Sequence, residues 1–227
     1  MTDYLNWGRF VNAFKQLLPY LPVTLKIVFW ANVLGVLFGI LIAKIRIHKV
    51  PVLNQISYLF ISFMRGTPLL VQMMVVYYGL PVILGLFGIG ANRWEKIIFA
   101  YAAYAMNQAA FLAEMFRGAI EAIPVSQNEA AYSVGLTKWQ TFRRIVLPQA
   151  IRIVLPSFGS DFVGLFQGTS LVYLMGVVDI MGRAKTIGTS TGHFMEPYLA
   201  AVVVYVVISI CVRCIFHYID TKSKYAA

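Results

Sequence analysis

Long apolar stretches alternate with short polar segments along the whole chain. An α-helix needs about 20 mostly apolar residues to cross the hydrocarbon layer of a membrane. By that criterion the sequence predicts five membrane-spanning helices, over residues 22–43, 56–78, 97–116, 151–175 and 197–219. The predicted fold is therefore an all-α integral membrane protein.

The fourth stretch is the weakest of the five on hydropathy, because Pro156 and several polar residues interrupt it. Its small and polar residues nevertheless share one helical face, since Ser157, Asp161, Gly164 and Gly168 follow helical spacing. Such a face belongs against another helix or a water-filled cavity rather than against lipid. The periodicity therefore supports a span over this stretch.

The N-terminal segment predicts a short amphipathic helix. Apolar Trp7, Phe10, Val11, Phe14 and Leu18 recur at helical spacing. Such a helix is expected to lie in the membrane interface before the first span. The predicted organisation is thus an interfacial helix over 1–18, a transmembrane domain over 19–219 and a cytoplasmic tail over 220–227.

Composition agrees with a membrane protein. Hydrophobic residues make up 59% of the 227 and charged residues only 12%, with a mean hydropathy of +0.73. Soluble domains carry about 25% charged residues, so an ordinary soluble protein and a disordered chain are both excluded. In a soluble chain the net charge of +10 would suggest nucleic acid. Here it is attributed to loops beside an anionic leaflet, and nucleic acid is not an expected partner.

The basic residues divide unequally between the two sets of loops that five spans create. Cytoplasmic loops carry an excess of Lys and Arg. The set on the side of the C-terminus holds eleven and the other set six, so the N-terminus is predicted outside and the C-terminus in the cytoplasm. The larger set comprises Lys44, Arg46, Lys49, Arg117, Lys138, Arg143, Arg144, Arg152, Arg213, Lys222 and Lys224.

Neither a metal site nor an enzyme active site is predicted. Cys211 and Cys214 lie inside an apolar stretch and are expected to be small buried packing residues. Zinc needs about four ligands, and the sequence offers no second cysteine pair. HExxH, GxSxG and glycine-rich phosphate-binding motifs are also missing from the sequence.

The loop over about residues 118–149 carries strong helix signals. Ser126 and Glu129 form a capping box, which predicts a helix that stops at Gly135. Thr137 opens a second capping box and a basic amphipathic helix that Pro148 is expected to end. The loop is therefore predicted to be a helix-turn-helix on the cytoplasmic face. A DNA-binding helix-turn-helix is a poor alternative, because a third helix and a soluble core are missing.

The same loop carries a family resemblance. Glu129-Ala130-Ala131, Gly135, Ile145 and Leu147-Pro148 have the form EAA-x3-G-x9-I-x-LP. This pattern resembles the signature loop of permease subunits of bacterial ATP-binding-cassette importers. The resemblance implies that the first short helix docks into a groove on an ATPase subunit. The ATPase-coupling residues expected from it are Glu129, Ala130, Ala131, Gly135, Leu136 and Trp139.

A second resemblance narrows the branch and extends over nearly the whole chain. Residues 65–72 read RGTPLLVQ, which is similar to a run in permeases for polar amino acids, and residues 169–171 resemble the same branch. Related permeases usually carry a lysine and an aspartate before that second segment, where this chain has Gln167 and Gly168. The resemblance therefore implies no role for such a charge pair in this chain. Residues 77–81, YYGLP, resemble the cystine-type permeases of this branch.

Two ionisable residues are predicted near the middle of the membrane. Arg65 and Asp161 each lie about ten residues into a span, where a charge is costly and marks a functional candidate. They are expected either to flank a cavity for a zwitterion, with Arg65 on the α-carboxylate and Asp161 on the ammonium, or to pair with each other. Arg65 could instead bond carbonyls freed by a kink at Pro68. The candidate substrate-binding residues are Arg65, Asp161, Asn107, Gln72 and Gln167.

One face of the third predicted span carries Tyr104, Asn107, Phe111 and Glu114 at helical spacing. This face is expected either to line the pathway on its inner side or to form a polar seam between helices.

The predicted function is that of a permease subunit of an ATP-driven, binding-protein-dependent importer of polar amino acids, in a bacterial cell membrane. The implied partners are ATP-binding-cassette ATPase subunits, an extracytoplasmic amino-acid-binding protein, a second copy or sister chain, and membrane lipid. The chain needs no cofactor; ATP and Mg belong to the partner ATPase, since this chain has no Walker motif. Two alternatives remain. An ion-coupled amino-acid carrier or channel leaves the loop unexplained, and a non-transporting membrane scaffold leaves Arg65 and Asp161 unexplained.

Overall fold

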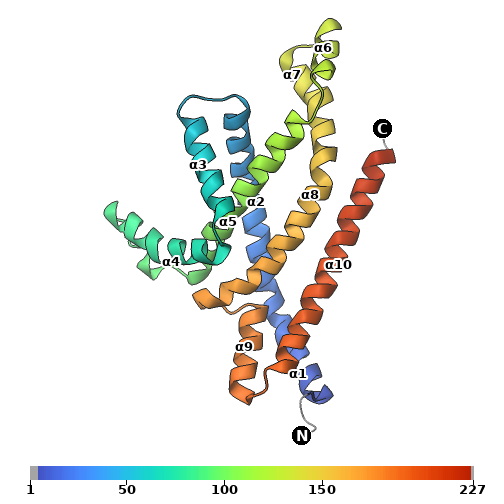
Figure 1. Cartoon of the computed structure of the whole chain (residues 1–227). Helices are drawn as coiled ribbons and strands as arrows, with labels where there is room; N and C mark the ends of the chain where they lie inside the picture. Colours follow the sequence, from blue (N-terminus) through green and yellow to red (C-terminus); the bar gives the residue numbers. More distant parts are fainter. Residues whose placement is uncertain (1–4, 226–227) are drawn as a thin grey trace.

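A computed structural model describes residues 5–225, and every regular element in this range is helical (Figure 1). Long helices form the body of the molecule, and short ones occupy its two ends. In chain order the elements are α1 (Trp7–Leu17), the 3₁₀ turn η1 (Leu18–Tyr20), α2 (Leu21–Ile47), α3 (Leu53–Gly66), α4 (Leu69–Leu86), the 3₁₀ turn η2 (Ala91–Arg93), α5 (Lys96–Glu121), α6 (Val125–Ser133), α7 (Lys138–Thr141), the π-helical η3 (Phe142–Val146), α8 (Leu147–Gly168), the 3₁₀ helix η4 (Thr169–Met175), α9 (Ile180–Thr191) and α10 (Met195–Tyr225).

Helices α2 and α5 pack closely because two glycines of α2 face α5. A Cβ atom added at Gly35 would lie 2.7 Å from Cγ of Gln108, and one added at Gly39 would lie 3.1 Å from Cβ of Leu112. Small residues at such positions let two helix backbones approach within a membrane. Helix α5 also contacts α3, α4 and α8, so it is the central helix of the fold.

Several helices are long and apolar enough to cross a membrane. Within the described part of the chain, Trp7–Ile47, Leu69–Leu86 and Met195–Lys222 meet this criterion on their own. Lys138–Met175 and Ile180–Thr191 meet it only as a pair, bent by 49° at the break between them, which is the form of a broken span or of a re-entrant loop. A multi-pass helical membrane fold is therefore confirmed, whereas the number of five spans stays a prediction.

The prediction of one continuous helix over residues 56–78 is wrong. Helix α3 ends at Gly66 and α4 begins at Leu69, with Thr67 and Pro68 in extended conformation between them. Proline lacks an N–H group and disfavours the helical conformation in the residue before it. Pro68 therefore ends α3, and α4 runs in a different direction (Figure 1).

The prediction that Pro148 ends the helix after Thr137 is also wrong, because α7, η3 and α8 follow one another without a break. Pro148 is the second residue of α8 and directly follows the π-helical turn η3, so the continuous helix accommodates its missing N–H group there. In the wider turn of η3 just before it, the N–H group of Leu147 donates to the carbonyl of Phe142. Pro156 lies inside α8 without interrupting it.

The predicted N-terminal helix is confirmed as α1, although residues 1–4 of the predicted segment lie outside the described residues. Ala13 and Leu17 of α1 are buried in a cluster with apolar residues of α9 and α10. An ion pair joins α1 to α10, with Nε of Arg9 2.8 Å from Oε1 of Glu196. Helix α1 is thus packed on the bundle, and its placement in the membrane interface stays a prediction.

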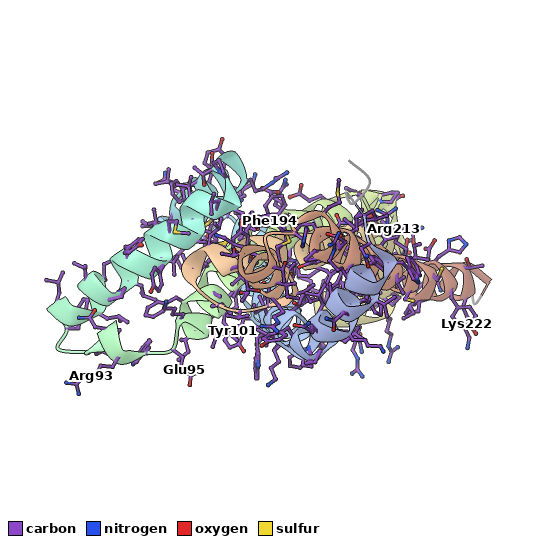
Figure 2. The ribbon with its side chains drawn as sticks, turned by 90° about the horizontal axis from the view of Figure 1, so that it is seen from below. Arg93, Glu95, Tyr101, Phe194, Arg213 and Lys222 are labelled. Carbon is purple, nitrogen blue, oxygen red and sulfur yellow. The ribbon has the colours of Figure 1, made fainter. Side chains whose placement is uncertain are left out.

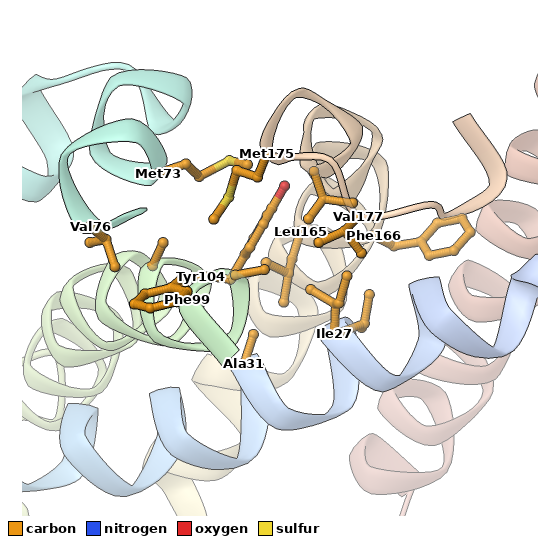
Figure 3. Packing of buried hydrophobic residues seen from close by; sticks show 14 of the residues in the cluster. Ile27, Ala31, Met73, Val76, Phe99, Tyr104, Leu165, Phe166, Met175 and Val177 are labelled. Carbon is orange, nitrogen blue, oxygen red and sulfur yellow. The ribbon is translucent and has the colours of Figure 1, made fainter. Parts of the chain in front are cut away.

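The main apolar core lies between α2, α4, α5 and the α8–η4 segment (Figure 3). The ring of Tyr104 is fully buried among residues that include Met73 and Phe166. Its hydroxyl group donates to the carbonyl of Gly168 at 2.7 Å, so the polar end of this ring is satisfied. The core therefore fixes α5 against the end of α8.

The α4–α5 hairpin projects away from α10, with Arg93 and Glu95 at its far end (Figure 2). Much of α10 is not covered by other helices of this chain. The prediction that Cys211 and Cys214 are buried is wrong, since both are exposed. Helix α10 contacts the bundle along one side only, and the spacing of the two cysteines places both on the other side.

Candidate functional site

Polar and aromatic side chains along α5 meet partners from α2, α3, α4 and α8. The predicted face of this helix therefore lies in a seam between helices. Its contacts run from Tyr104 with Gly168, through Asn107 with Gln72 and Phe111 with Arg65, to Glu114 with Arg46.

Gln72 holds the break between α3 and α4 together. Its side-chain Nε2 lies 2.8 Å from the carbonyl oxygen of Met64 and 2.9 Å from that of Thr67, and it donates to both. Its Oε1 accepts from Nδ2 of Asn107 on α5 at 2.9 Å. The predicted role of Arg65, which was to satisfy carbonyls freed at Pro68, therefore falls to Gln72. The two predicted substrate residues Gln72 and Asn107 contact each other.

Arg65 lies at the end of α3, and its residue is exposed in the chain. Its guanidinium carbon is 5.6 Å from the centroid of the Phe111 ring, which is a cation–π arrangement. Among the residues that the structure describes, no ion pair joins Arg65 to Asp161. The expectation that the two form a buried pair is therefore not met.

Asp161 is half-buried on α8 and lies against the buried amide of Gln108. Nε2 of Gln108 donates to Oδ2 of Asp161 and lies 3.5 Å from Oδ1 of Asn32 on α2. Asn32 in turn donates to the carbonyl of Val28 within its own helix. The carboxylate is thus held at the junction of α2, α5 and α8, where one face of α8 remains open.

The remaining predicted residue, Gln167, is exposed on α8, with Nε2 3.4 Å from Oγ of Ser209 on α10. Gln108 and Asn32 were not predicted, although a glutamine and an asparagine within apolar spans are signals that the sequence offers. The structure therefore groups Gln72 with Asn107, and Asp161 with two amides that sequence reasoning missed.

The loop between α5 and α8 has the predicted helix-turn-helix form. Helix α6 ends in a Schellman motif, in which Gly135 donates to the carbonyl of Tyr132 and Leu136 to that of Ala131. Gly135 has φ of +82°, as the predicted stop requires. Figure 1 shows α6 and α7 beyond the body of the bundle, toward the end where α10 finishes.

The second capping box is confirmed at Thr137, whose side chain accepts from the N–H group of Gln140 while Gln140 reaches back to Thr137. The first is wrong. Helix α6 begins at Val125 after Pro124, and no side-chain hydrogen bond caps it, so Ser126 lies inside the helix. Proline before a helix fixes an extended residue at its start, and it sets the boundary earlier than the serine would.

The predicted coupling residues are mostly exposed on this loop. Glu129, Ala130 and Gly135 are exposed, and Trp139 is 67% exposed although its ring stacks on Phe142. Two members differ, because Ala131 is buried and Leu136 is half-buried. An exposed tryptophan is typical of a surface that binds a partner protein.

Comparison with known proteins agrees with this arrangement. Residues 35–225 match the family model described as binding-protein-dependent transport system inner membrane component. The chain is 39% identical to an L-cystine transport system permease protein of Bacillus subtilis, over 96% of this chain and 90% of that protein. It is 32% identical to a glutamate/aspartate import permease protein of Escherichia coli, over 96% and 98% of the two chains.

The fold is also similar to that in the crystal structure of an amino acid ABC transporter with histidines. The TM-score is 0.83 at 30% sequence identity, and the match covers 98% of this chain and 99% of the other. Since the family model covers most of the sequence, this chain belongs to the family of inner membrane components of binding-protein-dependent transport systems.

Proposed function

We propose that this chain forms, with a second copy or a sister chain, the membrane pathway of an ATP-driven importer for polar amino acids. The chain itself is a transport component, and ATP hydrolysis belongs to separate subunits. Its partners are then two ATPase subunits, which carry ATP and Mg, and an extracytoplasmic amino-acid-binding protein. The relatives named for L-cystine and for glutamate/aspartate import support an amino-acid cargo.

The observation that carries this proposal is the exposed helix–glycine–helix over α6 and α7. Glu129, Ala130 and Trp139 present an open surface at one end of the bundle, and Gly135 sets the angle between the two helices. The apolar cluster of Ala119, Ile123, Val146 and Ala150 packs the inner end of α5 against η3 and α8. A force applied to α6 and α7 therefore reaches the long helices directly.

The experiment compares Gly135→Val with Gly88→Val in the complete transporter. Both glycines have positive φ and open space for a side chain, so both changes carry similar backbone strain. This strain is about 1–2 kcal/mol for a non-glycine residue in the left-handed conformation. Gly88 follows α4 and lies outside the loop. We expect Gly135→Val to stay in the membrane, to lose association with the ATPase subunits and to abolish uptake, while Gly88→Val keeps both. Normal uptake by Gly135→Val would contradict the proposal.

For the cargo, we propose L-cystine as the first substrate to test, because the cystine permease is 39% identical over most of both chains. Arg65 and Asp161 are the proposed contacts for the α-carboxylate and the ammonium group. Arg65 contacts Phe111 and Asp161 contacts Gln108, so neither charge neutralises the other. Uptake of labelled cystine, with glutamate and arginine as competitors, measures the preference. Transport of none of these amino acids would contradict the cargo assignment.

We further propose that the chain crosses the membrane five times, with the N-terminus outside and the C-terminus in the cytoplasm. The excess of Lys and Arg on one set of loops supports this orientation. The arrangement in Figure 1 agrees with it, since α1 lies at the opposite end from α6, α7 and the end of α10.

A further inference from the structure

A cluster of charged side chains joins the inner ends of α2, α3 and α5. Glu114 of α5 stands at its centre, with Oε1 3.6 Å from Nη2 of Arg46 on α2 and Oε2 2.6 Å from Nη2 of Arg117 on its own helix. Arg117 also pairs with Glu121, one turn further along α5. Arg46 extends the cluster to α3 by donating to Oδ1 of Asn54 at 3.3 Å.

The centre of this cluster is shielded from solvent within the chain. The side chains of Arg46 and Glu114 are only 16% and 17% exposed, whereas that of Glu121 is 50% exposed. The Arg46 guanidinium also lies 5.2 Å from the ring centroid of Tyr58 on α3. Ion pairs in such partly buried positions are weakly screened and fix geometry better than surface pairs do.

Glu114 therefore holds together helices that are far apart in the sequence. Among the described residues it is the ion-pair partner of Arg46, and the Nε atom of Arg46 is buried without a hydrogen bond. Loss of the Glu114 charge would leave Arg46 with the side-chain oxygen of Asn54 and the Tyr58 ring. The ionic link from α2 to α5 at this end depends on one carboxylate, beside the close packing of Gly39 against Leu112.

The cluster lies on the path from the α6–α7 loop to the membrane helices. After Glu114, α5 continues to Glu121, and Pro124 then leads into α6. On another side of this segment, Ala119 and Ile123 pack against η3 and α8. The last two turns of α5 thus contact α8 through apolar packing, and they contact α2 and α3 through the ion cluster.

We propose that Glu114 is a positioning residue that passes movement of the α6–α7 loop to α2 and α3. The inference rests on the proposed function, since it assumes that ATPase subunits move this loop. Apolar packing carries the movement to α8 in any case. Helices α2 and α3 also pack on α5 through small and apolar residues, and the ion cluster extends this contact to their inner ends, where the movement of the loop arrives.

The test uses the complete transporter with its ATPase and binding protein in liposomes. It compares Glu114→Gln, Arg46→Gln, their double variant and the matched control Glu121→Gln. The readouts are amino acid imported per ATP hydrolysed, the stimulation of ATP hydrolysis by the loaded binding protein, and thermal stability. The double variant leaves no charge without its partner, so it guards against a single variant that fails to fold.

We expect Glu114→Gln to lower the number of molecules imported per ATP at least tenfold, while the complex assembles and hydrolyses ATP. Arg46→Gln should give a similar loss. The double variant should be no worse than either single, because the two changes remove the same interaction. Glu121→Gln should stay within twofold of the unaltered transporter, because this residue contacts Arg117 but neither α2 nor α3.

An unchanged import per ATP in Glu114→Gln would overturn the proposal. So would a fall in stability and assembly with a normal ratio in the molecules that do assemble, since that result indicates packing alone. If the unaltered transporter neither binds the ATPase nor imports amino acids, the proposed function fails instead, and the two failures are thereby distinguished.

Discussion

Replacing Gln72 by leucine should destabilise the protein at the break between α3 and α4. Gln72 is 3% exposed, and its amide satisfies the carbonyls of Met64 and Thr67 and the Nδ2 group of Asn107. Leucine has a similar volume, so the change removes hydrogen bonds without opening a large cavity. Side-chain hydrogen bonds within membrane proteins average about 0.6 kcal/mol each. The three together give about 2 kcal/mol, or a fall in melting temperature of roughly 4–8 °C for a chain of this size.

The matched control is Gln167→Leu, since Gln167 is exposed and makes one long hydrogen bond, to Ser209. It should cost no more than about 0.6 kcal/mol. Thermal unfolding of the purified complexes in detergent, followed in parallel with uptake, measures both variants. If Gln72→Leu melts like the unaltered protein yet fails to transport, the role of Gln72 in holding the α3–α4 break together is refuted and a direct substrate contact is favoured. Equal losses of stability in the two variants would also refute the reasoning.

Three further predictions address topology, the charged residues and helix packing. Cysteine introduced at Lys138 should be labelled only from the cytoplasmic side and cysteine introduced at Arg93 only from outside; the reverse pattern would overturn the orientation. Asp161→Asn and Arg65→Gln should each change the free energy of unfolding by no more than about 1 kcal/mol and yet transport poorly. The reason is that the two residues are not paired in the structure, whereas breaking a buried ion pair costs about 3–5 kcal/mol. Gly35→Leu should destabilise the protein by about 1–3 kcal/mol, because its Cβ alone would lie 2.7 Å from a side-chain atom of α5; a thermal melt equal to that of the unaltered protein would contradict the close α2–α5 packing.

Two features that depend on neighbours within one or two helical turns could be predicted from the sequence, although the equally local capping box at Ser126 could not. The stop at Gly135 and the cap at Thr137 are confirmed, because each is made by backbone and side-chain groups at most five residues apart. The long apolar helices are predictable for a related reason, since burial of backbone hydrogen bonds in lipid requires an apolar helix of a certain length.

The effect of each proline, by contrast, was decided by its surroundings. Pro68 ends a helix, and the carbonyls freed there meet the side chain of Gln72. Pro156 lies inside α8 without ending it, and Pro148 follows the π-helical turn η3, which accommodates its missing N–H group. A proline in a sequence therefore shows where a backbone hydrogen bond of a helix is lost. It does not show which other group replaces that hydrogen bond.

The sequence by itself determined which polar residues stand in apolar stretches, and Asn32 and Gln108 are visible there although they were not predicted as site residues. Only the tertiary structure decided their partners. It separates Arg65 from Asp161, joins Asp161 to Gln108, and places Glu114 against Arg46. The physical reason is that such partners come from helices far apart in the sequence. Their distance is set by how closely α2, α3, α4 and α8 pack around α5, and no local pattern records it.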